Sequence, residues 1–349
     1  MRKTKLIFLF SALILSGCKG VENSIPLSPS LSGSAMASTD SSSSAEEGKT
    51  VTIDKYVSQV SDTLPYLLSK KDQGSIVNYV VTSYPVIASA RAKDSSLSVY
   101  GNVRTLFSEK YSTSGFPQAG LFIKKSLAED KSKEGEILSF LKAYASTVDE
   151  LISAPEKVKE ALDKVLPGDD AQKNKLGRTS SLALSVQKEK KNGFGFLSFT
   201  GQPDQEEYDR LKEPFSLNWQ VSSFSSFYGR DLKEQKAREN LSFSLITPSG
   251  APSLAFAPFA GSENFVTAAP NRVKSEFAKG EKDFIVFDSV NGRNLQGDKY
   301  EFVSRVTYGN LYVVSLGNDR NEVREDDDYI VGYGEGLIPD LAFKAVYQN

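Results

Sequence analysis

Short strand-like runs alternate with helical patterns along this chain of 349 residues, and this alternation constrains its fold more than any other feature. Val51–Ile53, Ile76–Val81 and Leu121–Ile123 are short and rich in β-branched or aromatic residues, which predicts strands. Apolar residues at helical spacing over 60–68 and 137–152 predict helices. Because strands separated by helices form parallel β-α-β units, the sequence predicts an α/β fold.

The last third of the chain repeats this alternation. It contains four more predicted strands and a closing helix that begins at Pro339: Ser242–Ile246, Phe284–Phe287, Leu311–Val314 and Tyr329–Val331 are the strands. From 171 to 239 the spacing of apolar residues is mixed and predicts neither type. We therefore expect one α/β lobe over residues 49–165, a crossing and helical region over 166–240, and a second α/β lobe over 241–349.

The beginning of the chain has the layout of an export signal. A positive patch of Arg2, Lys3 and Lys5 precedes about ten mostly apolar residues, a run too short to span a bilayer. This predicts a signal peptide over residues 1–17. The segment Leu15–Cys18 resembles the lipobox at which bacterial lipoproteins are cleaved and acylated, so we expect the mature chain to start at Cys18 with acyl chains such as palmitate.

A Ser-rich segment follows the cysteine. Residues 23–48 contain scattered Pro and Gly and almost nothing that a core could bury, which is typical of a flexible spacer. Residues 18–48 are therefore predicted to be a lipidated tether, and the protein is expected outside the cytoplasm, anchored to the cell membrane by its N-terminal lipid. The alternative is an ordinary secretory leader in which the cysteine occurs by chance.

Composition excludes several kinds of chemistry. Histidine is absent and there is one cysteine, so Ser-His-Asp and Cys-His catalysis, His-ligated zinc and an intrachain disulfide are ruled out. Lys plus Arg (42) nearly equals Asp plus Glu (44), which argues against the basic field that nucleic-acid binding needs. We expect a protein that is not an enzyme, with no cofactor, no metal and no nucleic-acid partner.

Two polar turns follow predicted strands, Thr247–Pro252 and Asp288–Gly292. Ligands of open α/β sheets bind at the carboxyl ends of strands, where the N–H groups of the following helix are free to contact them. Each turn can also be a capped turn without a ligand. The glycines of Gly332–Gly336 have the spacing GxGxG rather than GxGxxG, so we expect no dinucleotide site there.

Several segments resemble one known family. Leu245–Ala255, Asp283–Gly292, Thr307–Val313 and Gly332–Phe343 are similar to the first lobe of extracytoplasmic solute-binding proteins of ABC importers. These proteins have the type II periplasmic-binding fold, and the likeness is to the branch near nitrate, taurine and thiamine-precursor binders. Tyr56–Leu68, Val77–Val86 and Phe116–Lys124 resemble the second lobe of the same family. Because the second lobe comes first, the chain resembles a circularly permuted member.

The resemblance implies a monomeric, two-lobed protein that captures a small polar or anionic solute in an interlobe cleft and passes it to ABC permease subunits. The alternative is a surface sensor or interaction lipoprotein that keeps the fold without a transport ligand. Ser83 and Tyr84 stand where the family usually has an Ala-Glu-Pro type sequence. Asp62, at the start of a predicted helix, would repel an anion and is the weakest candidate.

The implied ligand-binding residues are mainly neutral hydrogen-bonding groups from both lobes. On one side they are Thr247, Ser249, Gly250, Ala251, Ser289, Asn291 and Gly292, with Asn310 near the floor. On the other side they are Ser58, Ser61, Asp62, Ser83 and Tyr84, with Gln118 on the returning strand.

The anchor prediction can be tested at the single cysteine. Replacing Cys18→Ser removes the thiol that acylation requires, so the variant should leave the membrane fraction or accumulate as an uncleaved precursor. Membrane fractionation and the mass of the N-terminal peptide measure both effects. Unchanged cleavage together with unchanged membrane retention would contradict the lipoprotein interpretation.

Overall fold

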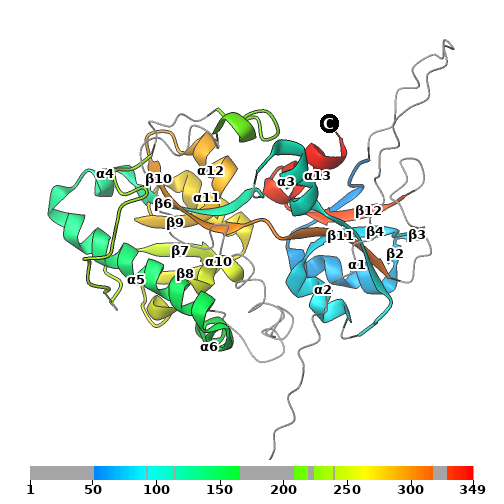
Figure 1. Ribbon diagram of the computed structural model, residues 1–349, viewed down its shortest axis with the longest axis horizontal. Helices are drawn as coiled ribbons and strands as arrows, with labels where there is room; N and C mark the ends of the chain where they lie inside the picture. Colours follow the sequence, from blue (N-terminus) through cyan, green and yellow to red (C-terminus); the bar gives the residue numbers. More distant parts are fainter. Residues whose placement is uncertain are drawn as a thin grey trace, which may run out of the picture.

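The computed structural model describes residues 51–165, 208–218, 224–316 and 328–348, apart from positions 92, 114 and 239. The predicted leader, the tether and most of the predicted crossing region lie outside these residues. The described chain forms two halves, each built on a five-stranded mixed sheet with its own helices (Figure 1). We name them the β9 half and the β4 half after the middle strand of each sheet. The predicted α/β class is confirmed.

The sheet of the β9 half has the strand order β10-β6-β9-β7-β8. The strands β7 (Leu245–Pro248), β8 (Phe265–Ala268) and β9 (Phe284–Asp288) are parallel to one another. The strand β6 (Pro117–Lys124) runs antiparallel to β9, and β10 (Tyr300–Tyr308) runs antiparallel to β6. The first four residues of β9 are all buried, as expected for a strand covered on both faces.

The sheet of the β4 half has the equivalent order β1-β12-β4-β11-β5. Here β1 (Lys55–Val57), β12 (Ile330–Tyr333) and β4 (Tyr79–Ser83) are parallel. The strand β11 (Leu311–Leu316) is antiparallel to both β4 and β5 (Leu97–Asn102). A separate small ribbon pairs β2 with β3, two strands of two residues each at 71–72 and 75–76.

The two sheets exchange their antiparallel strands. The edge strand β10 of the β9 half continues through Gly309 and Asn310 directly into β11 of the β4 half. In return, β5 continues through α3 (Val103–Tyr111) into β6 of the β9 half. Each sheet is therefore completed by a strand that arrives from the edge of the other, and the two crossings hold the halves together (Figure 1).

Helices surround each sheet. In the β4 half they are α1 (Thr63–Ser69), α2 (Tyr84–Arg91), α3 and α13 (Ile338–Tyr347). In the β9 half they are α4 (Lys125–Ala128), α5 (Glu134–Ser153), α6 (Val158–Val165), α10 (Ala251–Leu254), α11 (Pro270–Lys279) and α12 (Ser289–Leu295).

The long helix α5 shows how sequence pattern becomes packing. Its predicted apolar face, with Ile137, Leu141, Tyr144 and Val148, is buried in the largest core cluster, which belongs to the β9 half. The Tyr144 ring stacks on Phe256 at 4.9 Å between centroids. Burying four such side chains contributes about 1.5–3 kcal/mol each relative to exposure, which fixes α5 against the sheet.

Three local predictions are wrong. No strand occurs at Val51–Ile53, because β1 begins later, at Lys55. The predicted strand Ile76–Val81 is interrupted at residues 77–78: Ile76 ends β3, and Tyr79–Val81 belong to β4. The predicted turn Asp288–Gly292 is the start of α12, because the Asp288 carboxylate caps the backbone N–H groups of the first helical turn.

The predicted lobe boundaries also differ from the structure. Residues 49–165 do not form one lobe, because the chain leaves the β4 half after α3 and its β6, α4, α5 and α6 belong to the β9 half. Residues 241–349 are likewise divided: β7 to β10 belong to the β9 half, whereas β11, β12 and α13 belong to the β4 half. The physical reason is that the chain crosses between the sheets twice: the strands of the β9 half, β6 to β10, are consecutive, and those of the β4 half come from the stretches before and after them.

The two described ends of the chain meet in the β4 half. The first strand, β1, pairs in parallel with the last, β12, and the Gln348 side chain donates a hydrogen bond of 2.7 Å to the Val51 carbonyl. The strand β1 therefore belongs to this sheet and not to the one that contains Leu245 and Phe284.

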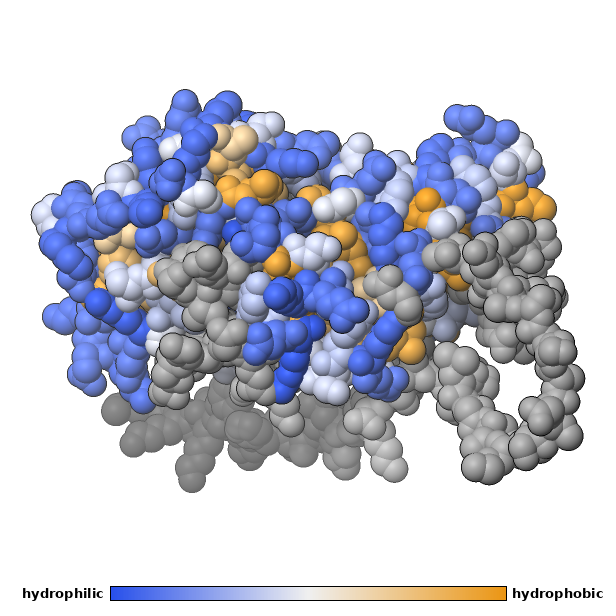
Figure 2. Space-filling model, turned by 90° about the horizontal axis from the view of Figure 1, so that it is seen from above, coloured by the Kyte–Doolittle hydropathy of each residue, from blue (hydrophilic) through white to orange (hydrophobic). Residues whose placement is uncertain are grey.

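The described surface is mostly hydrophilic. On the face seen from above, hydrophobic residues form several separate patches between hydrophilic ones (Figure 2). The two exposed large hydrophobic side chains, Ile76 and Leu295, lie in different halves. Scattered residues of this kind are ordinary on soluble proteins and indicate no docking surface.

The crossing at Gly309 provides a test of this fold. A Cβ atom at Gly309 would lie 1.8 Å from the Phe116 ring, so Gly309→Ala must displace a buried aromatic residue. We expect the free energy of unfolding to fall by about 1–3 kcal/mol in urea titrations. Gly261→Ala is the matched control, because a Cβ there meets nothing within 4 Å. Equal stability of the two variants would contradict the packing at the crossing.

Candidate functional site

A cavity of about 510 Å³ lies between the two halves. All six parallel strands have residues at or just beyond their carboxyl ends in its wall: β7, β8 and β9 from one half, and β1, β4 and β12 from the other. The crossings contribute Gln118 at the start of β6, and Tyr308 and Asn310 beside Gly309. The volume is in the range of small-molecule sites.

Neutral hydrogen-bonding groups line much of the cavity. They come from both halves and from the crossings: Ser58, Gln59, Ser61, Ser83, Gln118, Ser249, Asn271, Thr307 and Asn310. Such groups orient a ligand without requiring it to carry a particular charge. The apolar part of the wall includes Val60, Val86 and Leu162, together with prolines that follow several strand ends.

Two tyrosines of the wall have their hydroxyl groups held by neighbours. The Tyr56 hydroxyl donates to Asp340 Oδ1 at 2.6 Å, and burial together with Asp340 raises its pKa far above the usual value. The Tyr333 hydroxyl is hydrogen-bonded to Gln118 of the opposite half, and burial raises its pKa as well. Because these hydroxyls are engaged, they are less available to a ligand than the rings of the same side chains.

Asp288 is the carboxylate at the end of β9. Its Oδ1 accepts hydrogen bonds from the N–H groups of Val290 at 3.1 Å and Asn291 at 2.8 Å, which caps α12. Its Oδ2 accepts the N–H of Ile338 at 2.8 Å, at the start of α13 in the other half. Burial raises the pKa of Asp288 to about 6, although these hydrogen bonds act in the opposite direction.

The turn Tyr333–Leu337 between β12 and α13 lines the cavity and is held from both sides. Within the β4 half, the Gly336 N–H donates to Asp340 Oδ2 at 2.9 Å. From the β9 half, the Asn291 side chain donates to the Gly336 carbonyl at 3.0 Å. Gly334 and Gly336 both have positive φ, which is why this tight turn is rich in glycine. These contacts place Glu335 at the cavity wall.

The structure brings eight of the implied ligand-binding residues into the cavity wall: Ser58, Ser61, Ser83, Gln118, Ser249, Gly250, Ala251 and Asn310. They lie at the ends of strands or on the crossings, which is where the sequence placed them. Gly250 has a φ of 112°, and a Cβ there would meet no atom within 4 Å. Another residue at this position would therefore strain the backbone but would not clash with its neighbours.

Other implied residues lie elsewhere. Thr247 and Ser289 are fully buried beside the strand ends, and their hydroxyl oxygens have no hydrogen-bond partner among the described residues. Gly292 faces the Phe122 ring, which leaves no space for a side chain. Asn291 holds Gly336, and Asp62 is exposed outside the cavity wall. The expected loop at 288–292 is the start of a helix, which turns Ser289, Asn291 and Gly292 away from the cavity. The Tyr84 side chain lies outside the described residues.

Sequence reasoning missed other residues of the wall, among them Tyr56, Asn271, Asp288, Tyr333 and Glu335. Their shared signal is position, since each lies at the carboxyl end of a parallel strand or just beyond it. Asp288 opens the turn Asp288–Gly292, of which Ser289, Asn291 and Gly292 were the expected ligand-binding residues, and Glu335 lies in the glycine motif for which no nucleotide site is expected.

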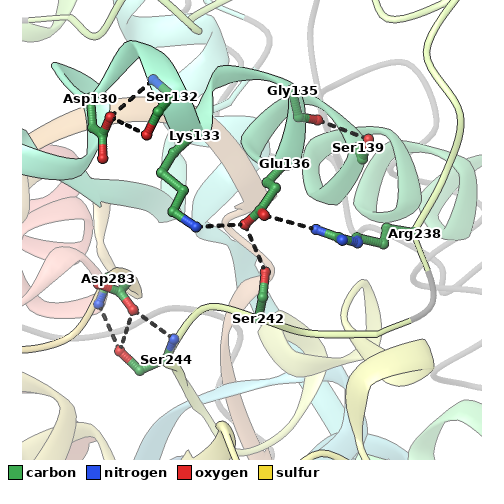
Figure 3. Close-up of polar contacts among 10 residues, drawn as sticks. All are labelled: Asp130, Ser132, Lys133, Gly135, Glu136, Ser139, Arg238, Ser242, Ser244 and Asp283. Carbon is green, nitrogen blue, oxygen red and sulfur yellow. Dashed lines mark hydrogen bonds and ion pairs between the residues drawn. The ribbon is translucent and has the colours of Figure 1, made fainter.

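A second polar cluster lies at the start of α5 (Figure 3). Glu136 pairs with Lys133 at 3.3 Å and with Arg238 at 3.6 Å, and it accepts a hydrogen bond from Ser242. The Lys133 ammonium holds the pKa of Glu136 below its usual value. These partly exposed groups satisfy one another and join α5 to the segment before β7, so the cluster has a structural role.

The described residues contain no group of three or more cysteine or carboxylate side chains placed to hold a metal ion. Among the described helices, none has both the length and the apolar composition that crossing a membrane requires. In comparisons with known proteins, no family model, no curated protein and no solved structure matches this chain.

The raised pKa of Asp288 predicts a dependence of stability on pH. Its folded pKa of about 6 lies above the ordinary 3.8, so ionised Asp288 destabilises the fold above pH 6, and this cost is relieved as pH falls toward 4. Relative to Asp288→Asn, the wild type should gain roughly 1–3 kcal/mol in free energy of unfolding between pH 7 and 4.

Urea titrations at several pH values measure this difference. Asp298→Asn is the matched control, because Asp298 is exposed. A difference between wild type and Asp288→Asn that stays constant with pH would show that the Asp288 carboxyl has an ordinary pKa.

Proposed function

We propose that this chain is a lipid-anchored, extracytoplasmic solute-binding protein that holds a small molecule between its two halves and delivers it to the permease subunits of an ABC importer. The observation that carries the proposal is the cavity between the halves, into whose wall all six parallel strands lead. Neutral hydrogen-bonding groups from both halves face the same space, so one solute can contact both. The protein acts as a monomer and performs no reaction on the solute.

The strand exchange supports a two-lobed arrangement of the type II periplasmic-binding kind. The two sheets have equivalent strand orders, and the crossings at Gly309–Asn310 and at α3 are the connections about which the halves can rotate. A solute that contacts both walls favours the closed arrangement through its higher affinity for it.

The position of the chain ends supports a circular permutation. In the β4 half, α13 follows β12 and ends beside the segment that leads into β1, which is parallel to β12. Joining the ends would therefore give a continuous β-α-β unit. The permuted break lies within this half, between α13 and β1, and leaves the cavity intact.

Retention of a small molecule tests the proposal. The full chain, purified in detergent, is incubated with the fraction of yeast extract below about 1 kDa, desalted and examined by native mass spectrometry. We expect a stoichiometric mass increase, because a cavity of this size encloses most of a small solute. No mass increase would contradict solute binding and favour the alternative, a surface sensor or interaction lipoprotein.

A matched pair of variants assigns the retained molecule to the cavity. Ser249→Trp places a large ring at the cavity wall from an exposed position and should abolish retention. Ser275→Trp, on the exposed side of α11, should retain the molecule as the wild type does. Equal retention by the two variants would place the binding site elsewhere.

A further inference from the structure

The charged groups in the described cavity wall are carboxylates. Asp288 is partly accessible at the end of β9, and Glu335 is exposed in the turn between β12 and α13. The two come from opposite halves, which meet here because the Ile338 N–H, just after the turn, donates to Asp288 at 2.8 Å. Glu335 acts over a short distance, since its charge contributes to the raised pKa of the Tyr56 hydroxyl.

Aromatic side chains belong to the same wall. Tyr56 and Tyr333 line the cavity, and their hydroxyl groups are engaged by Asp340 and Gln118. The face of an aromatic ring carries the negative part of its quadrupole and attracts cations at distances up to about 6 Å. Rings and carboxylates therefore favour the same kind of ligand group.

Building on the proposed function, we propose that the solute is an organic cation: an apolar body that carries a protonated or quaternary nitrogen. The nitrogen faces the carboxylates of Asp288 and Glu335 and the rings of Tyr56 and Tyr333. The apolar body contacts side chains such as Val86 and Leu162. This class differs from the anionic solutes that the sequence resemblance implied.

The charged neighbours of Asp288 fit this role. Arg293 of α12 lies with its guanidinium carbon 4.5 Å from the centre of the Phe302 ring, within the β9 half. On α13, Asp340 accepts hydrogen bonds from Tyr56 and from the Gly336 N–H, and it pairs with Lys344 at 2.9 Å. Glu335 lies in the turn that precedes α13, so the negative charges of Asp288 and Glu335 lie together at the cavity wall.

The experiment divides the small-molecule fraction of yeast extract by ion exchange into cationic, neutral and anionic pools. The full chain is exposed to each pool and examined by native mass spectrometry. We expect retention from the cationic pool. Retention from the neutral or anionic pool that equals or exceeds it would overturn the inference and leave solute binding standing. Retention from none of the pools would overturn the proposed function, and the inference with it.

Variants of the carboxylates locate the cation. Glu335→Gln should weaken retention from the cationic pool about two- to fivefold, the effect of one exposed charge at short range. Asp288→Asn should weaken retention more than Glu335→Gln does. If the loss of the Asp288 cap impairs folding, Glu335→Gln alone still tests the assignment. Glu263→Gln is the control, because Glu263 is exposed and lies outside the cavity wall. Equal retention by all of these variants would contradict the assignment.

Two variants of Tyr56 distinguish the contribution of its ring from that of its hydroxyl. Tyr56→Phe keeps the ring face and removes only the hydroxyl that Asp340 already holds, so retention should stay within about twofold of wild type. Tyr56→Leu removes the ring and should weaken retention about tenfold. The opposite order would show that the hydroxyl, and not the ring face, contacts the solute.

The pH profile provides a readout that a purely structural role of Asp288 would not give. With a pKa of about 6, the ionised fraction of Asp288 falls about fourfold between pH 7.5 and 5.5, so retention of a cation should fall by a similar factor. Asp288→Asn should remove this dependence. Retention that rises on acidification in the wild type would contradict the contact with Asp288.

Discussion

The exchange of strands between the two sheets is the constraint on which the rest of the structure depends. The chain enters the β9 half at β6 and leaves it after β10, so the strands of the β4 half come from two separate stretches of chain. Gly309 allows the crossing because its missing side chain leaves room for the Phe116 ring. The exchange directs the carboxyl ends of both sets of parallel strands toward one space, and the cavity follows from this arrangement.

The cavity is also the point where the two halves contact each other through side chains. Asp288 joins the start of α12 to the start of α13, Asn291 holds the turn at Gly336, and Gln118 holds Tyr333. Each contact links the β9 half to the β4 half beside the cavity wall. Residues of the cavity wall are thereby connected to groups that hold the halves in place, and under the proposed function this connection would couple binding to closure.

Much of the fold could be predicted from local pattern, whereas the pairing of strands could not. The apolar face of α5 predicts a helix and the apolar run of β9 predicts a strand, because both patterns are local properties of the sequence. The apolar run around Leu121 predicts a buried strand, but its residues do not indicate which of the two sheets the strand joins. The lobe boundaries failed for that reason. Likewise, serines at strand ends were found, but Tyr56 and Asp288 were missed, because their place in the wall depends on how the two halves meet.

Hydrogen–deuterium exchange in the presence of the small-molecule fraction of yeast extract tests the central claim most directly, that one solute contacts both halves at their strand ends. If one solute contacts both halves, exchange should be slower, when the solute is bound, in peptides that contain Ser83, Ser249–Ala251 and Tyr333–Leu337, which belong to different halves. Peptides from the outer helices such as α5 should be unchanged. Protection confined to one half, or located away from these strand ends, would contradict it.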